Sequence, residues 1–304
     1  MSALKKLTQI GLYPALLGGS VVSIVVLLAH LEPLWAMNAV NLSVAAVLIA
    51  AERALPYRPI WNQSRGETGT DLAYVGVSLV GLAVAAPIMA AFTAASLWLS
   101  QTLDVGLWPH HWHLASQVAL ALLIYELGSY SFHWLCHHTW LWRIHSVHHS
   151  VERMYWLNSM RSHPIDYVAA VATTSGPLLV LGIGDQAFAV VTVIGVTNMM
   201  IQHTNADMRT GFLDWIFITP AMHRWHHSTL AKEQQRNLGA NLIVFDLLFR
   251  SRMAPADREP PVAVGPGTPG PFPGRFVGQL AAPLAASVWH PNETGGNLSA
   301  ESLS

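Results

Sequence analysis

Residues Leu12–His30 read LYPALLGGSVVSIVVLLAH and contain no charged residue before the terminal His30. A helix needs about 20 apolar residues to cross the hydrocarbon core of a bilayer, and this run meets that length. Lys5 and Lys6 precede it, as they would precede the apolar core of a signal peptide. No A-x-A cleavage pattern ends the run, however, and a second apolar run follows at once. We therefore predict a membrane-spanning helix.

Five further apolar runs follow along the chain. Leu72–Leu99 is long and uncharged, so we expect either one tilted span or a tight re-entrant pair. One acid, Glu126, lies inside the next run. The last two runs are separated by residues 182–185 (GIGD) and predict a helical hairpin. The five runs are Asn38–Ala51, Leu72–Leu99, Leu114–Phe132, Tyr167–Ile183 and Phe188–Ile201.

The composition supports a membrane protein. Hydrophobic residues make up 52% of the 304 residues, charged residues make up 11%, and the mean hydropathy is +0.36. A typical soluble domain is about 25% charged, so disorder throughout and an ordinary soluble enzyme are both excluded. The net charge of −1 provides no positive field for nucleic acid. The single cysteine, Cys136, excludes an intramolecular disulfide and a Cys-rich zinc module.

The positions of Lys and Arg predict the orientation. With each run counted as one span and the N-terminus inside, all 16 Lys and Arg fall in segments 1–11, 52–71, 133–166 and 202 onward. Cytoplasmic loops carry an excess of Lys and Arg, so we place these segments in the cytoplasm. Both histidine-rich segments lie on the same side. The expected fold is an all-α integral membrane helical bundle with a cytoplasmic histidine-rich helical cap.

The chain divides into three expected parts. Residues 1–113 form N-terminal transmembrane helices, residues 114–253 form a catalytic domain that contains the histidine motifs, and residues 254–304 form a tail rich in Pro and Gly. The composition of the tail predicts a mobile segment that buries no core. The tail carries no dilysine or KDEL-type signal, which favours a bacterial inner membrane over the endoplasmic reticulum.

Eleven of the 16 histidines lie between residues 133 and 227. They form H-x-x-x-H at 133–137, H-x-x-H-H at 145–149 and again at 223–227, with one more histidine in the stretch QHTN. On a helix, residues i, i+3 and i+4 fall within an arc of about 100°, so we expect each H-x-x-H-H segment to aim three imidazoles at one point. The candidate metal ligands are His133, His137, His145, His148, His149, His203, His223, His226 and His227.

Nine imidazoles are too many for one metal ion and about right for two. A single helical histidine is more often a core residue, but nine clustered imidazoles would be poorly solvated without a ligand. Neutral imidazole binds Fe, Zn, Cu and Ni, and the scarcity of thiolates and carboxylates predicts an all-nitrogen site. Neither H-E-x-x-H nor G-x-S-x-G is present. Redox activation of dioxygen therefore fits these residues better than hydrolysis does.

Two alternatives stay open. A membrane zinc hydrolase could use the same histidines, with Glu126, Glu152 or Asp166 as the general base for a zinc-bound water. A metal transport or metal-binding protein could also hold them. Transporters place their ligands midway through several spans, whereas the outer half of each predicted span is apolar here.

The sequence around the histidines resembles the fatty acid hydroxylase superfamily, which includes sterol desaturases and bacterial lipid hydroxylases. Residues 141–150 (LWRIHSVHHS) look like its second histidine box, and residues 161–166 (RSHPID) look like the segment that follows in many bacterial members. Residues 219–228 (TPAMHRWHHS) look like the third box. Residues 237–239 (NLG) and 245–249 (FDLLF) resemble the segment that closes the domain.

The resemblance spans about residues 120–250. It implies a helical membrane enzyme with two non-haem iron ions held by histidines. Such an enzyme hydroxylates or desaturates an unactivated C–H bond of a bilayer lipid with O2 and two electrons, and recombinant protein can carry zinc instead. The family often has Asp, Arg and Trp where this chain has Glu126, Trp134 and Phe245. None of these departures removes a candidate ligand.

The electrons must come from outside the chain. The sequence contains no G-x-G-x-x-G nucleotide loop between a predicted strand and a helix, since the match at residues 265–270 (GPGTPG) lies in the Pro/Gly-rich tail, and it contains no cysteine set for an iron–sulfur cluster. We therefore expect a separate electron-transfer protein of the ferredoxin or cytochrome type. An acidic carrier or a lipid headgroup would be attracted by four arginines, although the positive-inside rule alone also accounts for them. These are Arg143, Arg153, Arg161 and Arg224.

Six further residues are expected to position the ligands or contact the substrate. Glu126 and Asp166 are expected to accept hydrogen bonds from ligand N–H groups and so to fix the imidazole tautomers. His163 precedes Pro164, which predicts a turn or an extended segment beside the site. The set is completed by Asn205, Asn237 and Asp246.

Overall fold

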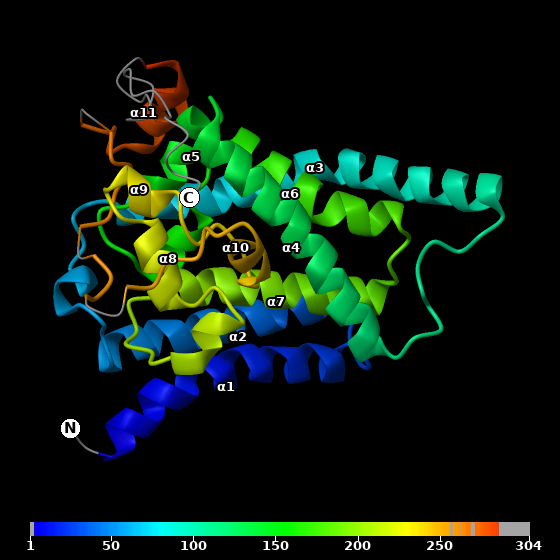
Figure 1. The fold of residues 1–304 in the computed structure, drawn as a ribbon, viewed down its shortest axis with the longest axis horizontal. Coiled ribbons are helices and arrows are strands. Elements are labelled where there is room, and N and C mark those ends of the chain that lie inside the picture. The colour runs from blue at the N-terminus through cyan, green and yellow to red at the C-terminus, as the bar shows by residue number, and fades with distance from the viewer. Residues whose placement is uncertain (1–2, 256–257, 262, 269–270, 286–304) are drawn as a thin grey trace.

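The computed structural model describes residues 3–255, 258–261, 263–268 and 271–285. Within these ranges it contains helices and three isolated β-bridges but no strand. Six long helices form a bundle, and short helices cover one end of it (Figure 1). The predicted all-α fold is confirmed.

Among the described residues, four helices are long and apolar enough to cross a membrane. One of them, α3, is continuous over 36 residues, so the run Leu72–Leu99 belongs to a single helix and not to a re-entrant pair. At 1.5 Å per residue α3 is about 54 Å long, which exceeds the roughly 30 Å of a bilayer core. The four helices are α1 (Ala3–Leu27), α2 (Pro33–Ala54), α3 (Thr68–Leu103) and α4 (Leu114–His138).

The predicted hairpin forms α6 (Pro164–Val180) and α7 (Asp185–His203). Both arms are predicted from the sequence to be spans, but neither is among the four helices that meet the length and apolarity required. With 17 residues, α6 is short for a span. Both arms nevertheless belong to the bundle. α6 packs against α3 and α4, and α7 packs against α1, α2 and α4.

Other elements enclose α7, and 13 of its 19 residues are buried. Its polar side chains find partners inside the protein. Tyr13 of α1 donates a hydrogen bond to Asn198 at 2.9 Å. Gln202 donates to the carbonyl oxygens of Ile218 at 2.9 Å and Ala240 at 2.6 Å. α7 therefore ties the bundle to the loops at one end of the molecule.

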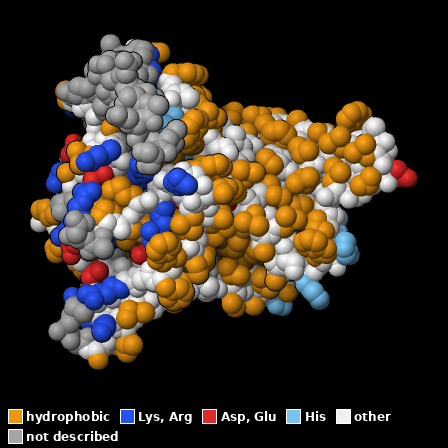
Figure 2. Space-filling model, viewed as in Figure 1, with side chains coloured by type: hydrophobic (Ala, Val, Ile, Leu, Met, Phe, Trp, Pro, Cys, Tyr) orange, Lys and Arg blue, Asp and Glu red, His pale blue; other side chains and the backbone are white. Residues whose placement is uncertain are grey.

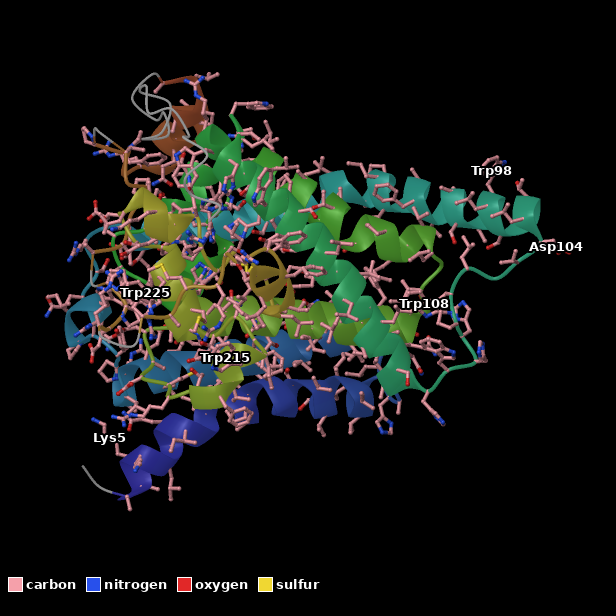
Figure 3. The ribbon with its side chains drawn as sticks, in the orientation of Figure 1. Lys5, Trp98, Asp104, Trp108, Trp215 and Trp225 are labelled. Carbon is pink, nitrogen blue, oxygen red and sulfur yellow. The ribbon has the colours of Figure 1, made fainter. Side chains whose placement is uncertain are left out.

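Short helices and loops form a cap over the end of the bundle where α4 and α7 finish (Figure 1). On the face drawn in Figure 2, Lys and Arg gather over the cap and hydrophobic side chains cover the rest. Figure 3 places Lys5 and Trp225 at this end and Trp98 and Asp104 at the opposite end. The short elements are η1 (Pro59–Asn62), α5 (Trp142–His149), η2 (Trp156–Met160), η3 (Gly211–Trp215), α8 (Pro220–His226), α9 (Ala231–Gln234), α10 (Val244–Leu248), α11 (Phe276–Ala281) and η4 (Ala282–Leu284).

Part of the Pro/Gly-rich segment packs on the cap. Val264 is buried in a cluster with Trp61, and the ring of Phe276 in α11 meets the ring of Tyr74 in α3 edge-on at 5.0 Å. The composition did not predict these contacts, because a segment too polar to form its own core can still contribute to another. The mobility predicted for the tail falls partly on residues 286–304, which lie outside the described residues.

The close approach of α4 and α6 at Gly128 yields a first prediction. A Cβ atom at Gly128 would lie 2.1 Å from the carbonyl oxygen of Thr173 in α6. We expect Gly128→Ala to force the helices apart and to destabilise the protein by about 1–3 kcal/mol, measured as a lower Tm in detergent. The control is Gly18→Ala, where a Cβ meets nothing within 4 Å. An unchanged Tm for Gly128→Ala would show that α4 and α6 do not pack in this way.

Candidate metal centre

Four elements bring the nine predicted histidines together under the cap. α4 continues past Phe132 and ends with the H-x-x-x-H motif, so His133 and His137 lie one helical turn apart. α5 carries three histidines, and α7 ends at His203. α8 begins at Pro220, a residue suited to the first position of a helix, and carries His223 and His226, with His227 directly after its last residue.

The histidines form two groups. Within each group every residue offers one ring nitrogen, and these nitrogens all lie within 4.8 Å of one another. His149 and His227 stack with their ring centroids 4.4 Å apart, so the two groups adjoin. The first group is His133, His137, His145, His149 and His226, and the second is His148, His203, His223 and His227.

Each H-x-x-H-H segment contributes to both groups, so the expectation that it aims three imidazoles at one point is wrong. In α5, His145 and His149 join the first group and His148 joins the second. In α8 the i, i+4 pair joins the second group and the remaining histidine joins the first. Residues i and i+4 differ by about 40° around a helix, whereas i+3 and i+4 differ by about 100°. The third imidazole therefore points to the neighbouring group.

Five of the histidines donate their Nδ1–H to an oxygen. His133 donates to the carbonyl of Leu238 at 2.7 Å, and His145 donates to the carboxylate of Asp166 at 3.1 Å. These hydrogen bonds fix the tautomer in which Nε2 carries no proton, as metal-bound imidazoles usually require. The other three donate to backbone carbonyls, His148 to Arg161 at 3.0 Å, His203 to Met199 at 2.9 Å and His226 to Arg236 at 3.0 Å.

The remaining ring nitrogens fit a metal site. Within the described residues, the buried Nε2 atoms of His133, His145 and His226 have no hydrogen-bond partner. The same is true of both ring nitrogens of His137 and His149. Buried polar atoms rarely lack a partner in a folded protein. Burial, and then the neighbouring histidines, hold the pKa of His149 well below its usual 6.5, so this ring is neutral at pH 7 and can donate a lone pair. The donor set suits two metal ions.

Glu126 acts on the site through a loop. Its expected hydrogen-bond partner is a ligand histidine. Its carboxylate instead accepts two backbone N–H groups of the loop at residues 237–241, at 2.6 and 2.8 Å. The carbonyl of Leu238 in this loop accepts the hydrogen bond from His133. Glu126 therefore positions His133 indirectly, through the loop whose carbonyl group binds that histidine.

Asp246 holds the same loop from the other side. It accepts the backbone N–H groups of Leu238 and Gly239, both at 2.8 Å. A Cβ atom at Gly239 would lie 2.9 Å from a Glu126 oxygen and 3.0 Å from an Asp246 oxygen, so only glycine fits between the two carboxylates. Asn237 begins the loop at a φ of +53°, and its amide donates to two backbone carbonyls at 3.0 and 2.8 Å.

Asp166 contacts a candidate ligand directly. It accepts hydrogen bonds from His145 at 3.1 Å and from the Ser162 hydroxyl at 2.9 Å. Burial by itself raises the pKa of Asp166, but His145 and Ser162 outweigh it and lower that pKa to about 2. Asp166 is therefore an ionised acceptor at pH 7.

Two of the expected positioning residues bind elsewhere. His163 caps α6 by accepting the N–H of Ile165 at 3.3 Å, and its Nε2 lies 3.3 Å from the carbonyl of Leu280. Asn205 binds the backbone of Arg58 through hydrogen bonds of 3.0 Å in both directions. Both residues connect the segments around the histidines and make these bonds away from the rings.

Three of the four arginines expected to attract a carrier are buried. Arg161 donates to Asp71 at 2.7 Å, and Arg153 donates to Glu67 at 2.6 Å. Arg224 donates to two backbone carbonyls at 3.1 and 3.2 Å. Because these side chains are buried and bind carboxylates or carbonyls of the protein itself, they are not available to a docking protein.

Sequence reasoning missed two kinds of site component. The first is Trp142, a fully buried residue whose ring lies 5.0 Å from that of His137 and 5.1 Å from that of His149. Its position in the second histidine box was the available signal. The second is the set of backbone carbonyls that accept the Nδ1–H groups. A carbonyl has no side-chain signature, so the sequence offered no signal for them.

Comparisons with known proteins identify relatives. The family model for fatty acid hydroxylase matches residues 118–251. An ornithine lipid hydroxylase of Rhizobium tropici is 37% identical over 256 residues, which is 83% of this chain and 76% of the relative. An alkylglycerol monooxygenase of Danio rerio is 30% identical over 148 residues, which is 48% of this chain and 33% of the relative. No solved structure matches this chain.

The contact between Asp166 and His145 yields a second prediction. We expect Asp166→Ala to lower metal affinity about 10- to 100-fold, because His145 loses the acceptor that orients it. Asp166→Asn keeps an oxygen acceptor and should lose less. Metal content after dialysis against a chelator measures both. The control is Asp185→Ala at the start of α7, far along that helix from its histidine. If Asp166→Ala retains as much metal as the wild type, the carboxylate does not position a ligand.

Proposed function

The chain belongs to the fatty acid hydroxylase family, and on this premise we propose that it is a membrane-bound non-haem di-iron oxygenase. As a member of this family it is an oxidoreductase that hydroxylates a lipid, which argues against the hydrolase and transport alternatives. The proposed reaction uses O2 and two electrons to hydroxylate, or desaturate, an unactivated C–H bond of a bilayer lipid.

The observation that carries this proposal is the pair of buried histidine groups. The ring nitrogens within each group lie within 4.8 Å of one another, a spacing that lets them share an ion at the usual metal–nitrogen distance of about 2.0–2.1 Å. We assign one iron to the group that contains His137 and the other to the group that contains His203. When bound, the irons would supply the oxygen activation that breaks an unactivated C–H bond.

The chain's own residues prepare the site. Asp166 and four backbone carbonyls hold the Nδ1 protons and leave Nε2 free for the metals. Trp142 and the buried cap residues keep bulk water away from the histidines. The two carboxylates that hold the loop at residues 237–241 keep His133 in place. These are positioning roles, and the metals carry the redox chemistry.

We propose that the electron-transfer protein docks on the cap. This end carries the Lys and Arg side chains seen in Figure 2, and it also covers the histidine groups. Lys232, Arg236 and Arg250 are exposed there and replace the buried arginines as candidate contacts for an acidic carrier.

The chain is an integral membrane protein of a bacterial type, and we propose that it lies in the inner membrane with the cap in the cytoplasm. The concentration of positive charge at the cap supports this orientation. Asp104 and the loop after α3 would then face the other side (Figure 3).

Metal stoichiometry tests the two-metal proposal. We expect about two irons per chain in protein expressed with ample iron. His226→Ala and His148→Ala should each lose about one iron, because they belong to different groups, and the double variant should lose both. His138→Ala is the control, since His138 lies outside both groups. When a chemical reductant supplies the two electrons, iron-loaded protein, but not the double variant, should consume O2 and add one of its oxygen atoms to a lipid. Protein without bound metal under these conditions would refute the proposal.

The proposed orientation is tested by labelling. In intact cells, a membrane-impermeant maleimide should modify Asp104→Cys and leave Lys232→Cys unmodified until the cells are lysed. Cys136 is buried and serves as the unlabelled background. Labelling of Lys232→Cys in intact cells would place the cap outside.

A further inference from the structure

Two hollows lie near α3, one beside the residues that precede the helix and one where α3 meets α6. The first is a polar pocket of about 640 Å³ beside residues 65–67, at the start of the helix. The second is an apolar groove of about 700 Å³ beside Gly76–Ile88, farther along the same helix. Glu67 and Gly76 are nine residues apart, which is about 13 Å along a helix. The two linings are therefore about one lipid headgroup and the start of an acyl chain apart along the helix axis, and they differ in polarity.

The polar pocket has an excess of positive charge. Four arginines and two glutamates line it, together with Ser150, Thr229 and two glycine-containing segments, 264–268 and 272–274. Arg153 and Arg161 are buried and engaged in ion pairs. At the rim, Arg65 and Glu152 form an exposed pair at 3.5 Å, and such a pair costs little to break. Arg275 at the rim is also exposed. A ligand with a phosphate or carboxylate suits these charges.

The groove offers only apolar surface. Every residue that lines it is Gly, Ala, Val, Ile or Pro. It lies between α3, a helix apolar enough to span a membrane, and the first half of α6. Val80 and Val84 at its edge are 65% and 54% exposed, so the groove opens toward the region that the bilayer fills. An acyl chain matches such a surface.

Some residues that line the two hollows contact the histidine groups or lie next to them in the sequence. Arg161 lines the pocket with its side chain, and its backbone carbonyl accepts the hydrogen bond from His148. Ser150, another lining residue, directly follows His149. The groove begins at Pro164 and Ile165, next in sequence to Asp166. Residues that line the hollows therefore also hold or adjoin residues of the histidine groups.

We propose that the pocket and the groove together bind one membrane lipid, with a phosphate or carboxylate of its headgroup in the pocket and an acyl chain in the groove. This inference rests on the proposed function and names the class of its substrate. Lipids that lack an ionised headgroup would fill only half of the site.

Native mass spectrometry of the full chain in detergent tests this binding mode. The protein is mixed with equal amounts of phosphatidylglycerol, ornithine lipid and diacylglycerol with the same acyl chains. We expect the wild type to retain the two ionised lipids at least tenfold better than diacylglycerol. Arg275→Glu should abolish most of this preference. Lys232→Glu makes the same charge change on the cap outside both hollows and should preserve the preference.

A second pair of variants tests the groove. Ala172→Phe should reduce retention of all three lipids, because the ring fills the groove. Ala83→Phe, on an exposed position of α3 outside the groove, should leave retention unchanged. Better retention of phosphatidylglycerol would identify phosphate as the group bound, and better retention of ornithine lipid would identify carboxylate. Equal retention of all three lipids by the wild type, or equal effects of Arg275→Glu and Lys232→Glu, would overturn the proposal. These measurements require neither metal nor turnover, so they stand apart from the tests of the reaction.

Discussion

A neutral imidazole buried in a protein retains one N–H group that requires an acceptor, and the protein supplies an oxygen acceptor to five of the nine candidate ligands. Five such groups meet four backbone carbonyls and one carboxylate. A donor left without a partner would cost about 1–3 kcal/mol, whereas a satisfied one contributes only about 1 kcal/mol net. The loops that carry Arg161, Arg236 and Leu238 must therefore pass at hydrogen-bond distance from the rings. The positions of these loops follow from the histidines.

Two carboxyl groups, one in the bundle and one in the cap, fix the position of a loop that contacts a candidate ligand. Glu126 lies inside an apolar helix and Asp246 lies in a short helix of the cap, yet both accept N–H groups from the same loop. Each carboxyl group accepts two backbone N–H groups, so four hydrogen bonds from two directions hold this loop. The absence of a side chain at Gly239 lets both carboxylates approach. The position of His133 therefore depends on residues that never touch it.

The sequence predicted the fold class and the histidines that assemble, because both depend on periodic patterns. Long apolar runs indicated helices, and the i, i+4 spacing placed histidines on shared helical faces. The sequence did not predict how α5 and α8 divide their histidines between two groups, since that depends on how the two helices face each other. Nor did it predict the burial of Arg161 and Arg224. An arginine in a loop has the same sequence signature whether it meets water or a buried aspartate. The partners of Glu126 and Asn205 were backbone groups, which sequence patterns do not reveal.

The enclosure of α7 affects how the protein can be assembled during synthesis. Asn198 and Gln202 would be costly to expose to lipid, since neither amide would find a partner in hydrocarbon. The three helices that surround α7 all precede it in the chain, so they leave the ribosome first. When α7 emerges, a protein-lined slot is already in place, and Tyr13 is ready to bind Asn198. The carbonyl partners of Gln202, at Ile218 and Ala240, are translated only afterwards. The order of the helices in the chain is thus also an order of insertion. α7 enters after the long helices that pack against it, and its last polar side chain gains its partners when the cap folds.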